Sequence, residues 1–204
     1  MFFSTCRDAH NSGTESGAAR SKHLNAVFDS DSTFLLWLAE VITGDPNVAQ
    51  ECLVDARKIS EQQSGLFVDW LSQWSRSATI QQAIQRAYRQ ISLASQKYEQ
   101  IRCPHGGHVP LSLEHFRILQ SVPAQKIAAD LDPFVRAVGI LRGVSHCVLQ
   151  DCAIRLGVSR TSVAAACCVF EHWTDLRKPS SVQDEPARHC GDLIWRMKAH
   201  SSVF

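Results

Sequence analysis

Cysteine and histidine gather in one short stretch of the chain. Cys103, His105 and His108 stand close together around a Gly-Gly pair, and His115 follows. A structural zinc ion takes four nitrogen or sulfur ligands in a tetrahedron, and these four side chains could supply them. Their spacing differs from the paired spacing of a zinc finger, so a linker that happens to contain histidine is the alternative. The overall expectation is no cofactor, with these four residues as the only metal candidates.

No arrangement of residues predicts catalysis. The chain has no glycine-rich phosphate loop, no Gly-x-Ser-x-Gly nucleophile motif and no His-Glu-x-x-His motif. Cys52, Cys167 and Cys168 lie on apolar faces, where a free cysteine acts as a small hydrophobic residue. We therefore predict that the protein is not an enzyme.

The segment 149–168 has the residue types of a helix-turn-helix. Two helices that cross closely need a small residue at the crossing, which Ala153 provides. Gly157 suits the turn because glycine tolerates positive φ, and Val163 can pack the second helix on the first. An unrelated helical hairpin is the alternative. The predicted helices cover 150–156 and 160–172.

In a helix-turn-helix, the side chains near the start of the second helix face the DNA. Arg160 could pair with a guanine edge or a phosphate, and a plain surface charge is the alternative. Ser159 is a good N-cap for this helix. The expected DNA-binding residues are Gln150, Arg155, Ser159, Arg160, Thr161 and Ser162.

The elements that must position these residues all have helical periodicity. Apolar residues recur at spacings of three and four from Asp31 to a stop at Gly44, and a second helix begins at Asp45-Pro46. A long helix follows over 66–101, and shorter ones are predicted over 113–120, 124–131 and 133–141. No strand-like alternation persists, so the fold class is all-α.

The long helix carries a heptad pattern, which allows two interpretations. It could be one helix along a domain core, or half of a coiled-coil dimer. Two of the seven positions are only alanine, which favours the core helix. The seven are Ile80, Ile84, Ala87, Ile91, Ala94, Tyr98 and Ile101.

Proline and glycine divide the chain into two small helical domains joined by a linker, the second of them the helix-turn-helix. We expect a disordered tail over 1–30, a helical domain over 31–101, the linker over 102–112, the helix-turn-helix domain over 113–173, and a C-terminal tail with a short helix over 174–204.

Length and charge limit the classes of function. The 204 residues have a net charge of +1, which excludes a strongly basic nucleic-acid coat. No apolar run reaches the roughly 18 residues of a membrane span, and the apolar start is shorter than the core of a signal peptide. A cytoplasmic protein without a membrane partner is therefore expected.

The order of these parts resembles the bacterial RNA polymerase sigma factors of the small, extracytoplasmic-function type. The stretch 131–163 is similar to their promoter-binding domain, and 34–56 and 67–80 resemble parts of their first domain. The matching residues of the second domain are Leu131, Arg136, Gly143, Ser145, Ala153, Gly157, Ser159 and Val163.

The resemblance implies two partners, core RNA polymerase and promoter DNA, the latter bound weakly by the protein alone. It assigns Glu51, Val54 and Asp55 to the surface that meets polymerase. An anti-sigma factor or another regulatory protein is a further partner of such a chain.

The chain also departs from the family pattern. Residues 150–204 contain seven Lys or Arg and six Asp or Glu, and thus have a net charge of only +1. The Ala164–Cys168 run offers DNA neither charge nor strong hydrogen bonds. The alternative function is therefore a degenerate sigma-like interaction module or regulator that has lost DNA recognition.

The family uses basic residues of the corresponding helix to melt DNA. The long helix of this chain has three of them, Arg76, Arg86 and Arg89. Trp70 and Trp74 could stack on an unpaired base, but their spacing favours a place in the core.

Overall fold

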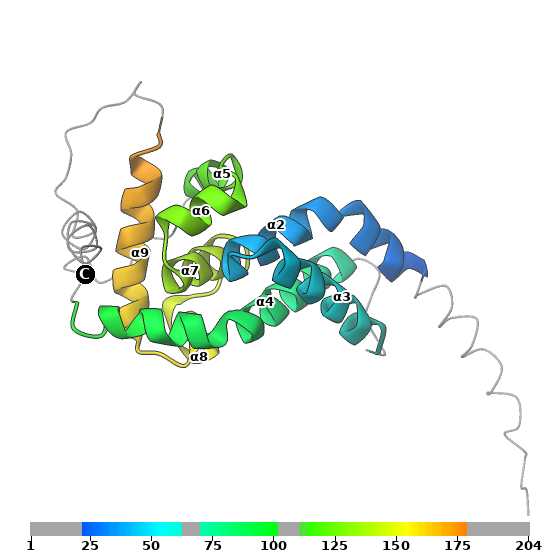
Figure 1. Ribbon diagram of the computed structural model, residues 1–204, viewed down its shortest axis with the longest axis horizontal. Helices are drawn as coiled ribbons and strands as arrows, with labels where there is room; N and C mark the ends of the chain where they lie inside the picture. The colour runs from blue at the N-terminus through cyan, green and yellow to red at the C-terminus, as the bar shows by residue number, and fades with distance from the viewer. Residues whose placement is uncertain (1–21, 63–69, 102–110, 112, 179–204) are drawn as a thin grey trace, which may run out of the picture.

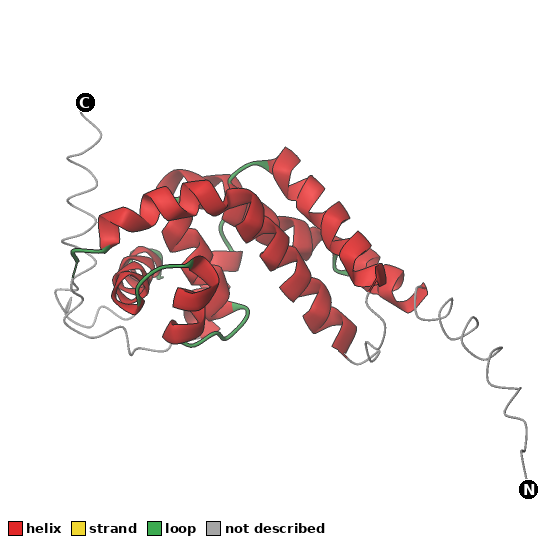
Figure 2. Ribbon diagram, turned by 90° about the horizontal axis from the view of Figure 1, so that it is seen from below, coloured by secondary structure: helices red, strands yellow, loops and turns green. Residues whose placement is uncertain are grey.

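The computed structural model describes residues 22–62, 70–101, 111 and 113–178, and every regular element in these ranges is helical (Figures 1 and 2). A helical segment over 22–30 comes first. The others are α2 (Ser32–Thr43), α3 (Pro46–Gln62), α4 (Leu71–Ser95), the 3-10 helix η2 (Gln96–Tyr98), α5 (Leu113–Gln120), α6 (Ala124–Asp130), α7 (Pro133–Gly143), α8 (Leu149–Leu156) and α9 (Arg160–Asp175). The all-α prediction is confirmed.

The ends of the first helices follow from single residues. Gly44 ends α2 at φ 76°, and its N–H donates to the Glu40 carbonyl over 2.7 Å. Asp45 begins α3, where its Oδ1 accepts from the backbone N–H of Asn47 at 2.8 Å and of Val48 at 3.3 Å. Glycine relieves the strain of a left-handed C-cap, and a carboxylate satisfies otherwise unpaired N–H groups. Both predicted boundaries are confirmed.

Helix α4 is the axis on which the rest of the molecule packs. It packs against α2, α3, α7 and α8, and α9 stands across its end in Figure 1. The heptad positions from Ile80 to Tyr98 are buried within this one chain. They therefore form an internal core face, which leaves no free seam for a coiled-coil dimer over this stretch.

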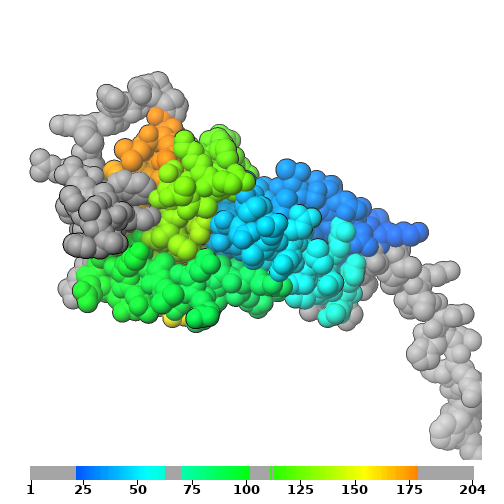
Figure 3. All heavy atoms as spheres, in the orientation of Figure 1, coloured from blue at the N-terminus to red at the C-terminus, as the bar shows by residue number. Residues whose placement is uncertain are grey.

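The two predicted domains share one hydrophobic core in the described residues. Buried side chains from α2 to α4 and from α5 to α9 form a single cluster, and Figure 3 shows the atoms of the two halves in continuous contact. The Tyr98 hydroxyl donates to Asp132 Oδ2 over 2.5 Å, and its ring packs on Phe134. The predicted linker over 102–112 lies almost wholly outside the described residues.

A buried arginine lies at this junction. Arg136 on α7 is 4% exposed, and its guanidinium lies close to Gly44, where an added Cβ would come within 2.6 Å of Nη1. Burial lowers the pKa of Arg136, and Asp132 opposes that shift. The carbonyl end of α2 is the negative end of the helix dipole, so it offers the buried cation a favourable field. Glycine is therefore favoured at residue 44 by its positive φ, and any Cβ there would require the Arg136 guanidinium to shift.

Two predictions about the N-terminal half need correction. Residues 22–30 are helical, with Leu24 and Phe28 buried in the core, so the predicted tail over 1–30 is too long; 1–21 lie outside the described residues. Trp70 is 64% exposed rather than buried. Trp74 is half-buried, and its Nε1–H donates to the Ser60 hydroxyl over 3.0 Å.

Within the described ranges, no single helix is long and apolar enough to cross a membrane. Helices α8 and α9 reach that length and composition only as a pair, with a bend of 110° between them. Most of α9 is buried inside the protein, as a core helix is.

Candidate functional site

The corner between α8 and α9 is built by a few local residues. Gly157 ends α8 at φ 65°, and the N–H of Val158 donates to the Ala153 carbonyl over 3.0 Å. Ser159 begins α9, where its Oγ accepts from the N–H of Ser162 at 3.0 Å. The helices then diverge by 110°, within the range of helices joined by a short turn. Ala153 and Val163 are buried between them, as their positions predict.

The structure places most of the expected DNA contacts at the surface of this corner. Gln150, Arg155, Arg160 and Thr161 are exposed, and so is the turn residue Ser159. Ser162 is different, because it is fully buried and its hydroxyl lies 2.8 Å from that of Ser159. The inclusion of Ser162 was wrong, because its side chain completes the cap instead of facing outward.

After its first turn, α9 is a core helix. The buried residues of this helix run from Ser162 to Glu171 without a break and include Trp173, which is fully buried. It packs against α5, α7, α8 and η2, so other helices of the same chain cover it. The Ala164–Cys168 run is therefore used for packing within the chain. Among the residues that the structure describes, the exposed side chains of α9 are those of its first turn, Arg160 and Thr161.

The far end of α9 is held by a polar cluster. Arg177 lies over the Trp173 ring at 4.0 Å and pairs with Asp130 of α6 at 2.5 Å. Burial, with Asp175 nearby, raises the pKa of Glu171 to about 7, although Arg142 and Lys178 oppose the shift. Glu171 is therefore partly protonated at neutral pH, which fits a structural position close to apolar groups.

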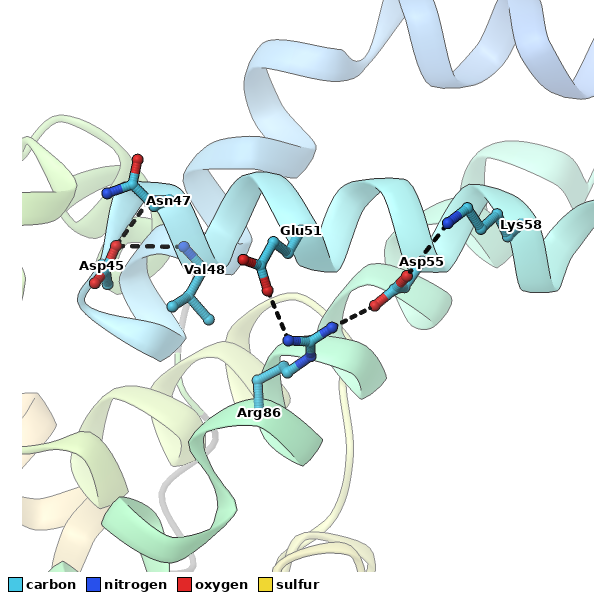
Figure 4. A network of polar contacts seen from close by, with 7 residues as sticks. All are labelled: Asp45, Asn47, Val48, Glu51, Asp55, Lys58 and Arg86. Atoms are coloured by element: carbon cyan, nitrogen blue, oxygen red, sulfur yellow. Dashed lines mark hydrogen bonds and ion pairs between the residues drawn. The ribbon is translucent and has the colours of Figure 1, made fainter.

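The acidic residues expected to meet polymerase lie together on α3. Glu51 and Asp55 are one helical turn apart, and Val54 between them is 48% exposed. Figure 4 shows both carboxylates turned toward Arg86 of α4. Arg86 Nη1 donates to Glu51 Oε2 over 2.6 Å, and Nη2 donates to Asp55 Oδ2 over 2.7 Å. We call these four residues the acidic face.

A shallow hollow of about 290 Å³ lies at the acidic face, and its wall also includes Gln50 and Lys58. Lys58 Nζ lies 4.0 Å from Asp55 Oδ1. The hydrogen bond to Asp55 is the main cause that raises the pKa of Arg86. Sequence analysis placed Arg86 only among the basic residues that face DNA. Its pairing with α3 joins residues 31 and 35 positions apart, which no local spacing could indicate.

The described cysteines do not form a reactive site. Cys52, Cys147, Cys152 and Cys167 are free and buried. Burial raises the pKa of Cys52 to about 11 and those of Cys152 and Cys167 to about 12. Thiols with such values are almost entirely protonated at neutral pH and are poor nucleophiles. Cys168 is disulfide-bonded, which corrects the expectation that it is a free thiol.

Most of the candidate zinc set cannot be placed, because Cys103, His105 and His108 lie outside the described residues. His115 is described, and its Nε2 lies 3.7 Å from Asp175 Oδ1. Burial is the main cause that lowers the pKa of His115. In the part of the chain that the structure covers, no three His, Cys, Asp or Glu side chains gather as a metal site would need.

The described residues therefore present two surfaces of different character, the corner of α8 and α9 and the acidic face of α3 and α4. The first is an exposed turn with two arginines in front of a buried helix. The second is a charged hollow on an exposed helix. Comparison of the chain with protein-family models, with curated proteins and with solved structures finds no match.

Proposed function

We propose that this chain is a divergent sigma-like transcription factor. It binds core RNA polymerase through the acidic face and contacts promoter DNA through the corner of α8 and α9. The observation that carries the proposal is this corner, with its left-handed Gly157, its Ser159 cap and a bend of 110°. Such a corner is what a helix-turn-helix uses to aim the start of its second helix at DNA.

The exposed side chains at the corner suit a weak DNA contact. Arg160 and Thr161 lie in the first turn of α9, where recognition helices meet base edges, and Arg155 and Gln150 flank them on α8. Asp151 is also exposed on α8, so these charges sum to only +1. Few phosphate contacts mean low affinity for DNA, which fits a factor that depends on polymerase for most of its binding energy.

The acidic face suits the polymerase contact that the resemblance assigns to it. Its carboxylates stand on an exposed helix beside an exposed Val54, a combination that offers both charge and apolar area to another protein. A protein of this kind would act in the cytoplasm, where polymerase is, and a regulatory protein such as an anti-sigma factor could compete for the same surface.

The test is capture of the purified full chain by bacterial core RNA polymerase. The informative variant is Glu51→Gln with Asp55→Asn, which removes two charges and keeps the side-chain shapes. The matched control is Glu61→Gln with Glu99→Gln, which removes the same charge from two other exposed positions. We expect the wild type and the control to be captured and the first variant to be lost. No capture of the wild type would exclude the sigma-like function.

A second candidate function is a sigma-like interaction module without DNA recognition, and the burial of α9 from Ser162 onward favours it. Duplex DNA separates the two. Binding by Arg155 and Arg160 would weaken as salt is raised, because counterions are released on binding. Absence of any salt-dependent binding to DNA, by the free chain or by its complex with polymerase, would favour the module.

A further inference from the structure

The acidic face is already occupied by a cation of the same chain. One guanidinium from α4 spans two carboxylates that stand one turn apart on α3, and both contacts are short (Figure 4). Glu51 and Asp55 contribute two negative charges, whereas Arg86 and Lys58 contribute two positive charges. The charges of these four residues therefore sum to zero. A basic partner that approaches this face meets two carboxylates that each already accept a hydrogen bond from Arg86.

The ion pairs of Arg86 with Glu51 and Asp55 lie at the surface, where another cation can replace Arg86. The side chains of Arg86, Glu51 and Asp55 are 43%, 58% and 32% exposed. Solvent and salt screen ion pairs of this kind, so they hold the two helices together only weakly. The cores of α3 and α4 pack without it through buried residues such as Cys52 and Ala83. Arg86 can thus leave the carboxylates without opening the fold.

The surroundings define the partner that would take its place. The partner must bring a guanidinium or ammonium group to two carboxylates at the spacing of a helical turn. It must also bring an apolar side chain, because Val54 lies exposed between them and lines the same hollow. A helix with basic residues one turn apart and apolar residues beside them meets both needs.

We propose that Arg86 is an intramolecular competitor at the acidic face, which a basic and apolar helix of a protein partner displaces when it binds. The proposal rests on the polymerase contact proposed above for the identity of that partner. In the free protein Arg86, together with Lys58, balances the charges of Glu51 and Asp55. In the complex the partner's cation takes Glu51 and Asp55, and Arg86 turns to solvent.

The test compares Arg86→Gln with Lys97→Gln, which removes the same charge from an exposed position of η2, just after α4. Binding is measured to core RNA polymerase and to a synthetic helical peptide with two arginines one turn apart and leucines beside them. We expect Arg86→Gln to bind both about twofold to fivefold more tightly than the wild type, since the competing ion pair is weak. Lys97→Gln should bind as the wild type does.

A second variant guards against loss of structure. Arg86→Lys keeps the charge but cannot span both carboxylates, so its affinity should lie between those of the wild type and Arg86→Gln. Helical content and the thermal midpoint of each variant are measured by circular dichroism. Weaker or unchanged binding by a folded Arg86→Gln would overturn the competitor role, since Arg86 would then hold the carboxylates in place for the partner or have no part.

The two proposals fail in different ways. If polymerase captures the wild type and Arg86→Gln gains nothing, the competitor role is wrong and the sigma-like function stands. If no variant binds polymerase but the peptide binds Arg86→Gln more tightly, the function is wrong and the competitor role stands for another basic helix. If neither probe binds any variant, both proposals are wrong.

Discussion

The acidic face and the corner of α8 and α9 differ in how much of each surface is exposed to solvent. On α3, Glu51 and Val54 are exposed and Asp55 is partly exposed, and surface ion pairs from Arg86 and Lys58 engage the two carboxylates. On α9, the helix expected to enter DNA is exposed for a single turn and buried from Ser162 onward. By our proposal the first surface would accept a partner by exchanging one side chain. The second offers DNA only its tip.

This difference separates a proposed binding surface on α3 from a core helix, α9, of which only the first turn is proposed to bind. Trp173 and Phe170 are among the largest fully or nearly fully buried side chains, and both belong to α9. A helix that supplies the core cannot also leave it to lie along a groove without a large loss of packing. The predictions that follow test this division, in order of decreasing effect.

The largest effect is expected from Trp173→Ala. Removing a fully buried indole leaves a cavity and should lower the free energy of unfolding by about 3–5 kcal/mol. Trp70→Ala, at a residue that is 64% exposed, is the control and should change it by less than about 0.5 kcal/mol. Urea unfolding followed by circular dichroism measures both. Similar losses at the two positions would break the distinction between a core α9 and an exposed start of α4.

The pH dependence of stability tests the buried end of α9. The pKa of Glu171 is raised from 4.5 to about 7, chiefly by burial, so the folded state binds its proton more tightly than the unfolded state does. This proton therefore stabilises the fold below about pH 4.5, and its contribution is lost as the pH rises through about 7. The Glu171→Gln variant stays neutral and should lack this loss.

At pH 8 we expect Glu171→Gln to be more stable than the wild type by about 2–3 kcal/mol relative to their difference at pH 4.5, from the size of the pKa shift. Urea unfolding at the two pH values gives the comparison. Glu114→Gln, at an exposed position on α5, is the control. A difference independent of pH would mean that Glu171 is as well solvated as a surface carboxylate.

The turn of the corner is tested at Gly157. An alanine there must adopt φ 65°, which costs an L-residue about 1–2 kcal/mol, although its Cβ would meet only the Tyr88 hydroxyl at 3.4 Å. Asparagine tolerates this conformation better, so Gly157→Asn should lose less stability than Gly157→Ala. Thermal unfolding measures the order. An equal loss in both variants would point to crowding at the turn instead of backbone strain.

The smallest effect on stability is expected at the exposed tip. Arg160→Gln should leave the free energy of unfolding within about 0.5 kcal/mol of the wild type. It should reduce the slope of log affinity for duplex DNA against log salt by about one, because one phosphate contact is removed. Arg117→Gln on α5 removes the same charge away from the corner and is the control. A slope equal to that of the wild type would remove Arg160 from the proposed contact.

Local features of the fold could be predicted from the sequence, because each depends on a residue and its nearest neighbours. Gly44, Asp45, Gly157 and Ser159 end or begin helices for reasons of φ and hydrogen bonding that act within four positions. The apolar stripe of α4 indicated its buried face for the same reason.

The rest depends on which elements meet. The Ala164–Cys168 run could have faced a protein, DNA or the chain itself, and only the positions of α5, α7 and η2 decide that it is internal. The pairing of Arg86 with α3 depends on two helices lying side by side. The spacing of Trp70 and Trp74 predicts that both lie in the core. Trp70 is nevertheless exposed, because it lies just before the first turn of α4, outside the part of the helix that packs against other elements.

Helix α4 has a consequence for how the molecule comes apart. The 3-10 helix η2 directly continues α4, and its Tyr98 contacts Asp132 and Phe134, whereas the earlier turns of α4 pack against α2 and α3. Helix α4 with η2 therefore belongs to both halves at once. A fragment that stops at Ile101 would lose the contacts of Tyr98 with Asp132 and Phe134, and one that begins after it would lose the same contacts from the other side. Heating should therefore melt the two halves in a single cooperative transition, and neither half should remain folded when the chain is divided between residues 101 and 113.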